Sequence, residues 1–136
     1  MALFTWSDAL SVGNEFIDHD HQKLIVLVND FHDAVELRSD RNAIEKTLDR
    51  LIAFTREHFA REESTMQRIN YAEFTAHKHE HDILIRDALE LKDIFASGMA
   101  VLSVKVSTFL KDWLLNHIMQ TDKQLAQAIR QTATAN

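Results

Sequence analysis

Seven histidine, glutamate and aspartate side chains fall on stretches of the sequence where apolar residues recur every three or four positions. They are His21, His58, Glu62, His77, His81, His117 and Asp122. An amphipathic helix turns such a face toward the protein interior. Burying charged groups there is costly unless they are paired or bound to a metal. We therefore expect these seven side chains to bind metal inside the protein.

The spacing of these residues supports a shared site. Two pairs are four residues apart, namely His58 with Glu62 and His77 with His81. A four-residue step turns an α-helix by about 40°, so both side chains of a pair point the same way. His117 and Asp122 are five residues apart, a turn of about 140°. Either these two flank a wide buried face, with Asp122 reaching in from the side, or a local π-bulge aligns them.

The ligand inventory favours two metal ions over one. Five imidazoles and two carboxylates are too many for a single zinc ion. Carboxylates can bridge, so two ions sharing Glu62 and Asp122 would use the set better. Iron accepts both imidazole and carboxylate. The chain has no cysteine, which excludes thiolate zinc and iron–sulfur sites. A di-iron centre is therefore the best chemical interpretation.

Four long helices are predicted to position these ligands, at about 18–37, 43–68, 72–96 and 103–130. Asn42 with Glu45 and Asn70 with Glu73 resemble capping boxes, and Gly98 is suited to end the third helix. The ligands fall early, late, early and late along the successive helices. An up-down-up-down antiparallel four-helix bundle therefore brings them to one end. With no proline and only two glycines, the chain is predicted to be all-α.

The 136 residues correspond to one domain, 1–136, in which residues 1–16 form an N-terminal arm. The apolar side chains of the arm are expected to dock on the bundle. They are Phe4, Trp6, Val12 and Phe16.

The overall charge and the absence of targeting signals narrow the class of protein. There are 15 basic and 21 acidic residues, a net charge of −6, which disfavours binding to nucleic acid. There is no signal-peptide pattern and no apolar run long enough to span a membrane. We therefore expect a cytoplasmic protein.

Some polar residues are expected to be bystanders. His19, His32 and His79 are predicted not to bind metal, because a single histidine on a helix face is seldom a ligand. Asp20, which precedes the predicted ligand His21, is interpreted as a tolerated neighbour and not as a ligand. The acidic residues of the third helix are interpreted as a solvated face; they are Glu80, Asp82, Asp87 and Glu90.

Four segments that carry the ligands resemble the hemerythrin family, specifically its bacterial single-domain members. They are IDHDH (17–21), HFAREE (58–63), HKHEH (77–81) and WLLNHIMQTD (113–122). The resemblance covers the chain almost from end to end, and no ligand position departs from the family pattern.

The resemblance implies a non-haem pair of iron ions with an oxo or hydroxo bridge, also bridged by Glu62 and Asp122. Three histidines would saturate one iron, namely His77, His81 and His117. His21 and His58 would hold the other iron and leave one position open for dioxygen. Apolar neighbours are expected to line the oxygen pocket and exclude water, and they are Leu24, Ile25, Phe59, Trp113 and Ile118.

The expected function is reversible dioxygen binding for storage, transport or delivery to an oxygen-using enzyme. A stand-alone oxygen or redox sensor is an alternative. A di-iron oxidase or peroxidase is less favoured, because ferritin-like oxidases use carboxylate-rich sites with Glu-x-x-His pairs, whereas imidazoles predominate here. We therefore expect a binding protein, not an enzyme.

Overall fold

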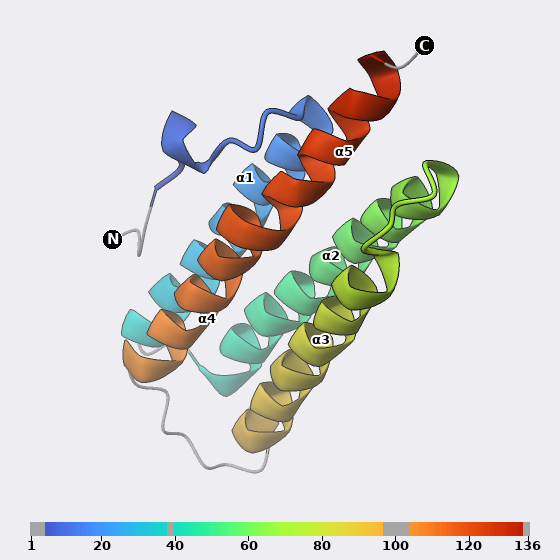
Figure 1. Cartoon of the computed structure of the whole chain (residues 1–136). Coiled ribbons are helices and arrows are strands. Elements are labelled where there is room, and N and C mark those ends of the chain that lie inside the picture. Colours follow the sequence, from blue (N-terminus) through green and yellow to red (C-terminus); the bar gives the residue numbers. More distant parts are fainter. Residues whose placement is uncertain (1–4, 38–39, 97–103, 135–136) are drawn as a thin grey trace.

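The structure is a computed structural model that describes residues 5–37, 40–96 and 104–134. Its helices lie side by side as long rods, which confirms the predicted all-α bundle (Figure 1). The elements are a 3-10 turn η1 (Asp8–Leu10), α1 (Glu15–Glu36), α2 (Arg41–Arg68), α3 (Phe74–Ala96), α4 (Val104–Asn116), the π-helical segment η2 (His117–Asp122) and α5 (Lys123–Thr134). Within the described ranges, every helix is too short or too polar to cross a lipid bilayer.

The packing of the rods follows the order of the chain. Helix α1 packs against α2 and α4, and α2 packs against α3. Helices α4 and α5 are joined through η2 and run end to end as the fourth rod (Figure 1). Residues early in α1 and α3 therefore lie at the same end of the bundle as residues late in α2 and in η2.

Helices α1 and α2 both begin earlier than predicted, because side chains upstream cap them. Asn14 Oδ1 accepts hydrogen bonds from the backbone N–H groups of Phe16 and Ile17, so α1 begins at Glu15. Asp40 Oδ1 accepts from Ala43 N–H, so α2 begins at Arg41. The predicted capping box at Asn42 is wrong, since Asn42 already lies inside the helix.

Asn70 ends α2 and does not begin α3. It has a left-handed backbone with φ 54°, which asparagine tolerates better than most residues. The N–H of Asn70 donates to the carbonyl of Gln67, and the N–H of Tyr71 donates to that of Met66. This pair of bonds is a Schellman motif, which satisfies carbonyls at the end of a helix. The predicted Asn70 cap is therefore wrong, and α3 begins at Phe74 rather than at position 72. The predicted end at Gly98 lies outside the described residues.

One stripe of α2 is buried along the whole length of the helix. Each of its members is at most 6% exposed, and they are Ile44, Leu48, Leu51, Thr55, His58, Glu62 and Met66. Two aromatic side chains are exposed, and one of them, Phe16, was expected to dock on the bundle. Phe16 is 84% exposed and Phe109 is 43% exposed, so neither belongs to the core.

The N-terminal arm docks on the bundle through side-chain and backbone contacts. Val12 is buried and Trp6 packs against the core. Asp18 Oδ1 accepts from Val12 N–H, and Arg130 of α5 donates to the carbonyls of Val12 and Gly13. Phe4, also expected to dock, lies outside the described residues.

The fourth rod resolves the two alternatives for His117 and Asp122. Both lie in the π-helical segment η2, at its first and last positions. A π-helix bonds residue i to residue i+5, so two residues five apart come to the same face. The π-bulge alternative is therefore the one that the structure contains.

Candidate metal centre

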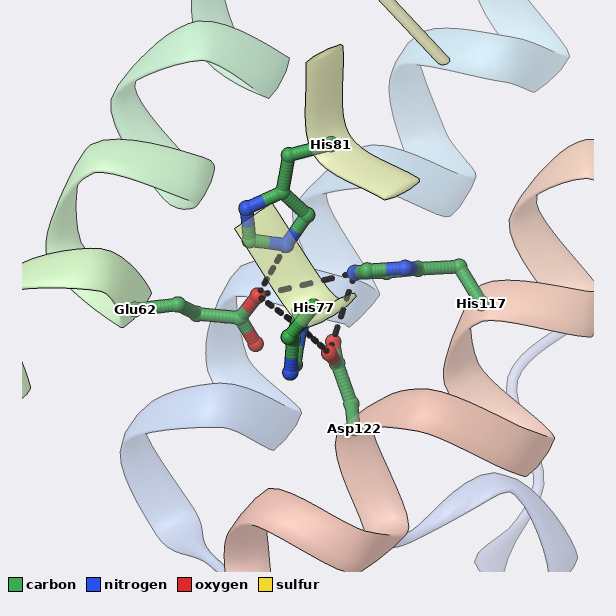
Figure 2. Close-up of side chains that lie close together, drawn as sticks. All are labelled: Glu62, His77, His81, His117 and Asp122. Atoms are coloured by element: carbon green, nitrogen blue, oxygen red, sulfur yellow. Dashed lines mark ion pairs between the residues drawn. The ribbon is translucent and has the colours of Figure 1, made fainter. Parts of the chain in front are cut away.

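The seven predicted ligands converge in the interior of the bundle, and each is at most 3% exposed. Their ligand atoms form two clusters that share both carboxylates. The larger cluster, drawn in Figure 2, contains Glu62, His77, His81, His117 and Asp122. The smaller cluster contains His21, His58, Glu62 and Asp122. Helices α1, α2 and α3 and the η2 segment all contribute.

Glu62 lies between the two sets of histidines. Its Oε1 faces the larger cluster, at 3.0 Å from His81 Nε2 and 3.5 Å from Nε2 of both His77 and His117. Its Oε2 faces the smaller cluster, at 3.4 Å from His58 Nε2. One carboxylate thus points one oxygen to each side.

Asp122 divides its oxygens in the same way. Its Oδ1 lies 3.0 Å from His117 Nε2 and 3.2 Å from His77 Nε2. Its Oδ2 lies 2.6 Å from His21 Nε2 and 3.4 Å from His58 Nε2. Two carboxylates arranged in parallel, each with one oxygen on either side, have the arrangement needed to bridge a pair of ions.

The donor atoms also fit metal ions by their spacing and by their lack of other partners. Two ligand atoms about 2.1 Å from one ion and at right angles to each other are about 3 Å apart, close to the distances found here. Several of the buried atoms have no hydrogen-bond partner among the described residues, namely both Glu62 oxygens, Nε2 of His77, His81 and His117, and Asp122 Oδ1. Buried polar atoms are rarely left unsatisfied, so these residues suit bound cations.

A carboxylate outside the two clusters, that of Asp20, orients the ring of His58 through its Nδ1 atom. Asp20 Oδ2 lies 3.0 Å from His58 Nδ1, and it also accepts hydrogen bonds from Arg61, whose Nε and Nη2 are each 3.0 Å away. A carboxylate on the far nitrogen fixes the tautomer of a metal-binding imidazole and leaves Nε2 free for the ion. Asp20 therefore supports the site although it is not placed to be a ligand.

Two further carboxylates orient histidine rings of the larger cluster in the same way. Glu63 Oε2 lies 2.9 Å from His81 Nδ1, and Glu80 Oε1 lies 3.2 Å from His117 Nδ1. Glu80 also accepts a hydrogen bond from the hydroxyl of Thr121, which is part of η2. The prediction that Glu80 belongs to a solvated face is wrong, because this side chain joins α3 to the π-helical segment.

Sequence reasoning missed these supporting residues because they lie off the apolar stripes. Each is a chain neighbour of a ligand: Asp20 precedes His21, Glu63 follows Glu62 and Glu80 precedes His81. One residue along a helix is a turn of about 100°, so a neighbour lies beside the buried face. An acidic residue directly beside the predicted ligands His21, Glu62 and His81 was the available signal.

Charge pairing governs the protonation of the metal-free site. Burial lowers the pKa of His58 and His77, but the carboxylates Glu62 and Asp122 outweigh it and raise both to about 9. Burial and the charge of Asp122 raise the pKa of Glu62, yet the histidines around it bring that pKa down to about 2. Without metal, the site at neutral pH therefore pairs imidazolium with carboxylate.

Four of the five residues predicted to line an oxygen pocket are buried in the bundle. Leu24, Ile25, Phe59 and Trp113 are each at most 7% exposed. The ring of Phe59 stacks on that of His81, with centroids 3.8 Å apart and planes 5° from parallel. The side chain of Ile118 lies outside the described residues. Their role in oxygen binding stays a prediction.

A cavity of about 1040 Å³ reaches the smaller cluster from the surface. It opens among α1, α2 and α5, and His58 and Glu62 form part of its lining. None of the four described residues of the predicted oxygen pocket lines it. The cavity thus lies on the two-histidine side of the site, where His58 and Glu62 themselves stay buried.

The three histidines predicted to be bystanders lie outside both clusters. His19 and His79 are exposed, and His32 is buried with its Nε2 3.2 Å from Glu36 Oε1.

Comparison with known proteins identifies the family. The profile described as "Hemerythrin HHE cation binding domain" matches residues 12–129, a range that contains all seven predicted ligands. The chain belongs to the hemerythrin family. Hemerythrin relatives include the bacteriohemerythrin of Methylococcus capsulatus, 40% identical over 126 residues, which cover 90% of this chain and 94% of that protein. A hemerythrin-like protein of Naegleria gruberi is 36% identical over 120 residues, which cover 88% of this chain and 87% of that protein.

Solved hemerythrin structures share the fold. The crystal structure of a wild-type hemerythrin superposes with a TM-score of 0.87 at 37% sequence identity, covering 94% of this chain and 98% of that one. The crystal structure of a hemerythrin mutant gives the same TM-score and covers 95% of this chain and 98% of that one. The bundle of this chain is thus the hemerythrin bundle. Family membership also agrees with the buried cation-binding chemistry of the two clusters.

Proposed function

We propose that this protein holds two iron ions at the seven clustered residues and binds dioxygen there reversibly. The observation that carries the proposal is the division of Glu62 and Asp122 between two histidine sets of unequal size. Membership of the hemerythrin family supports iron as the metal and dioxygen as the ligand.

The unequal sets account for a free position on one ion. The larger set offers three ring nitrogens and two carboxylate oxygens, whereas the smaller offers two ring nitrogens and two oxygens. A bridging oxo or hydroxo group would add one ligand to each ion. Since iron of this type accepts about six ligands, an ion held by His21 and His58 would keep one open position. The cavity that reaches His58 lies on that same side.

The residues around this open position would determine whether bound dioxygen is released or reduced. Two ferrous ions held there would supply the electrons that dioxygen takes up on binding and returns on release. Leu24, Ile25 and Trp113 exclude water around the site, and they have no carboxyl group to donate a proton to a bound ligand. A dry site with few acids favours release of dioxygen over its reduction.

The bound oxygen would serve storage, transport or delivery to an oxygen-using enzyme. The carrier role is favoured over an oxidase because the five imidazoles of the site outnumber its two carboxylates. An oxygen or redox sensor would use the same site chemistry with a different partner, and we rank it second.

An anaerobic oxygen cycle tests the proposal. The iron-loaded protein is reduced without air, exposed to oxygen and then flushed with inert gas, while its spectrum is recorded. Reversible binding predicts a coloured form that returns fully to the colourless form over repeated cycles. Irreversible oxidation in the first cycle, accompanied by formation of a product, would contradict a carrier and favour an oxidase.

A further inference from the structure

The cavity among α1, α2 and α5 is larger than oxygen binding requires. Its volume of about 1040 Å³ is at the upper end of the range, about 300–1,000 Å³, that holds drug-sized molecules. Dioxygen has only two atoms. The cavity therefore has room for a second ligand that is larger than dioxygen.

One part of the cavity is apolar. Ile17 of α1 and Leu125 and Ile129 of α5 form this part of the lining. Phe16 also lines the cavity, and its large aromatic side chain is 84% exposed to solvent. An exposed hydrophobic residue beside a concave apolar surface is typical of a ligand site.

The other part of the cavity is cationic. Lys23 Nζ lies 5.0 Å, and Arg61 Cζ 5.4 Å, from the centre of the Phe54 ring, so the two cations are at most about 10 Å apart. Within the described parts of the chain, Lys23 has no carboxylate partner. Exposed His19 lies one turn before Lys23 on α1 and lines the same cavity. Arg61 is paired with Asp20, so Lys23 carries the uncompensated positive charge of this part, on a protein whose net charge is −6.

The acidic residues of the lining do not cancel this cluster. Glu15 lies at the start of α1, eight residues and about 12 Å of helix before Lys23. Asp20 is already paired with His58 and Arg61, and Glu62 is 3% exposed at the inner end. An anionic group entering the cavity is therefore attracted toward Lys23 and repelled from the inner end. About 10 Å of α1, seven residues at 1.5 Å each, separates Lys23 from the level of Phe16.

We propose that this cavity binds an amphipathic monoanion, a medium-chain carboxylate, with its head at Lys23 and its hydrocarbon chain against Ile17, Leu125 and Ile129. A chain of about ten carbons matches the distance between the cationic and apolar parts. The inference does not rest on the proposed oxygen binding, because none of these contacts involves iron. An occupied cavity would also stand between solvent and His58.

Calorimetric titration of the iron-loaded protein with decanoate tests this site, with decanol as the uncharged probe of equal chain length. We expect decanoate to bind and decanol to bind at least tenfold more weakly. Lys23→Glu should weaken decanoate binding at least tenfold. Lys46→Glu makes the same charge change at an exposed position of α2 outside the cavity, and it should change the affinity less than twofold.

A second variant tests the apolar part without altering charge. Ile129→Trp fills the cavity from α5 and should also weaken decanoate binding at least tenfold, while circular dichroism checks that the helices are retained. The proposal is overturned if no heat of binding is seen up to 1 mM decanoate, if decanol binds as tightly, or if Lys46→Glu weakens binding as much as Lys23→Glu.

Discussion

His117 and Asp122 are five residues apart in the chain, yet Nε2 of His117 lies 3.0 Å from Oδ1 of Asp122. The π-helical segment makes this approach feasible, since in an α-helix the two side chains would diverge by about 140°. Glu80 of α3 holds the same segment by accepting a hydrogen bond from the Thr121 hydroxyl. The irregular backbone of η2 thus completes both clusters.

The support given by Glu80 leads to the first prediction. Glu80→Gln weakens the acceptor for His117 Nδ1 and for the Thr121 hydroxyl, so metal affinity should fall roughly 10- to 100-fold. Competition for iron against a chelator of known affinity measures it. Glu90→Gln, an exposed position on the same helix, is the matched control and should leave the affinity unchanged. Equal losses in both variants would show that Glu80 has no specific role.

The position of Glu62 between the two clusters leads to the second prediction. Glu62→Ala removes an oxygen from both clusters, so the purified protein should contain less than about one iron per chain in place of about two, and its melting temperature should fall. His79→Ala should change neither, because His79 is exposed and lies outside the clusters. Elemental analysis and thermal unfolding give the two readouts. Similar iron loss in both variants would mean that the assignment of helix faces is wrong.

The third prediction concerns protons. In the metal-free protein, carboxylates raise the pKa of His58 and His77 to about 9, above the usual value near 6.5. The stability that these pairs give the metal-free fold is therefore complete below pH 6.5 and is lost as the pH rises through 9. Metal binding needs neutral imidazole, so loading at pH 7.5 should release protons, and the apparent affinity should increase up to about pH 9. A pH indicator in weak buffer records the release; loading without proton release would contradict the pairing.

Phe59 gives the fourth prediction. Its ring covers His81 and lies near His117, with ring centroids 3.8 and 5.1 Å apart. Phe59→Ala should admit water, accelerate autoxidation of the oxygenated form several-fold and destabilise the fold by about 3–5 kcal/mol. Phe109→Ala, at a position that is 43% exposed, is the control. The decay of the oxygenated spectrum gives the rate, and an unchanged rate would remove Phe59 from the oxygen pocket.

The fifth prediction tests the corrected start of α2. Asp40→Ala removes the acceptor for the Ala43 N–H and should cost about 1 kcal/mol of unfolding free energy. Asn42→Ala should cost little, because Asn42 lies inside the helix. Denaturant unfolding of the two variants compares them. The opposite ranking would restore Asn42 as the cap.

Periodicity was sufficient to predict the bundle and the convergence of its ligands. A polar residue such as Glu62 stands out on an otherwise apolar helix face. The helical repeat alone is enough to predict that such a residue is buried. The repeat does not define helix ends, because Asn42 and Asn70 each have an acidic residue three positions later whether or not they cap a helix. At Asn70 the left-handed backbone decides the matter, and three-dimensional packing sets that backbone.

The supporting carboxylates show the same limit. Glu80 belongs to the solvent side of α3 by its spacing, and only the approach of η2 gives it His117 and Thr121 as partners. The exposure of Phe16 could not be predicted from the sequence either. A cavity between helices does not alter the apolar pattern of any single helix.

The central claim is reversible dioxygen binding by a pair of iron ions, and gas recovery tests it most directly. Reduced protein with a measured iron content is equilibrated with a known amount of oxygen, and the oxygen released under vacuum is then measured. The account predicts uptake of about one dioxygen per two irons and its recovery as dioxygen. Uptake without recovery, or uptake that does not scale with iron content, would contradict it.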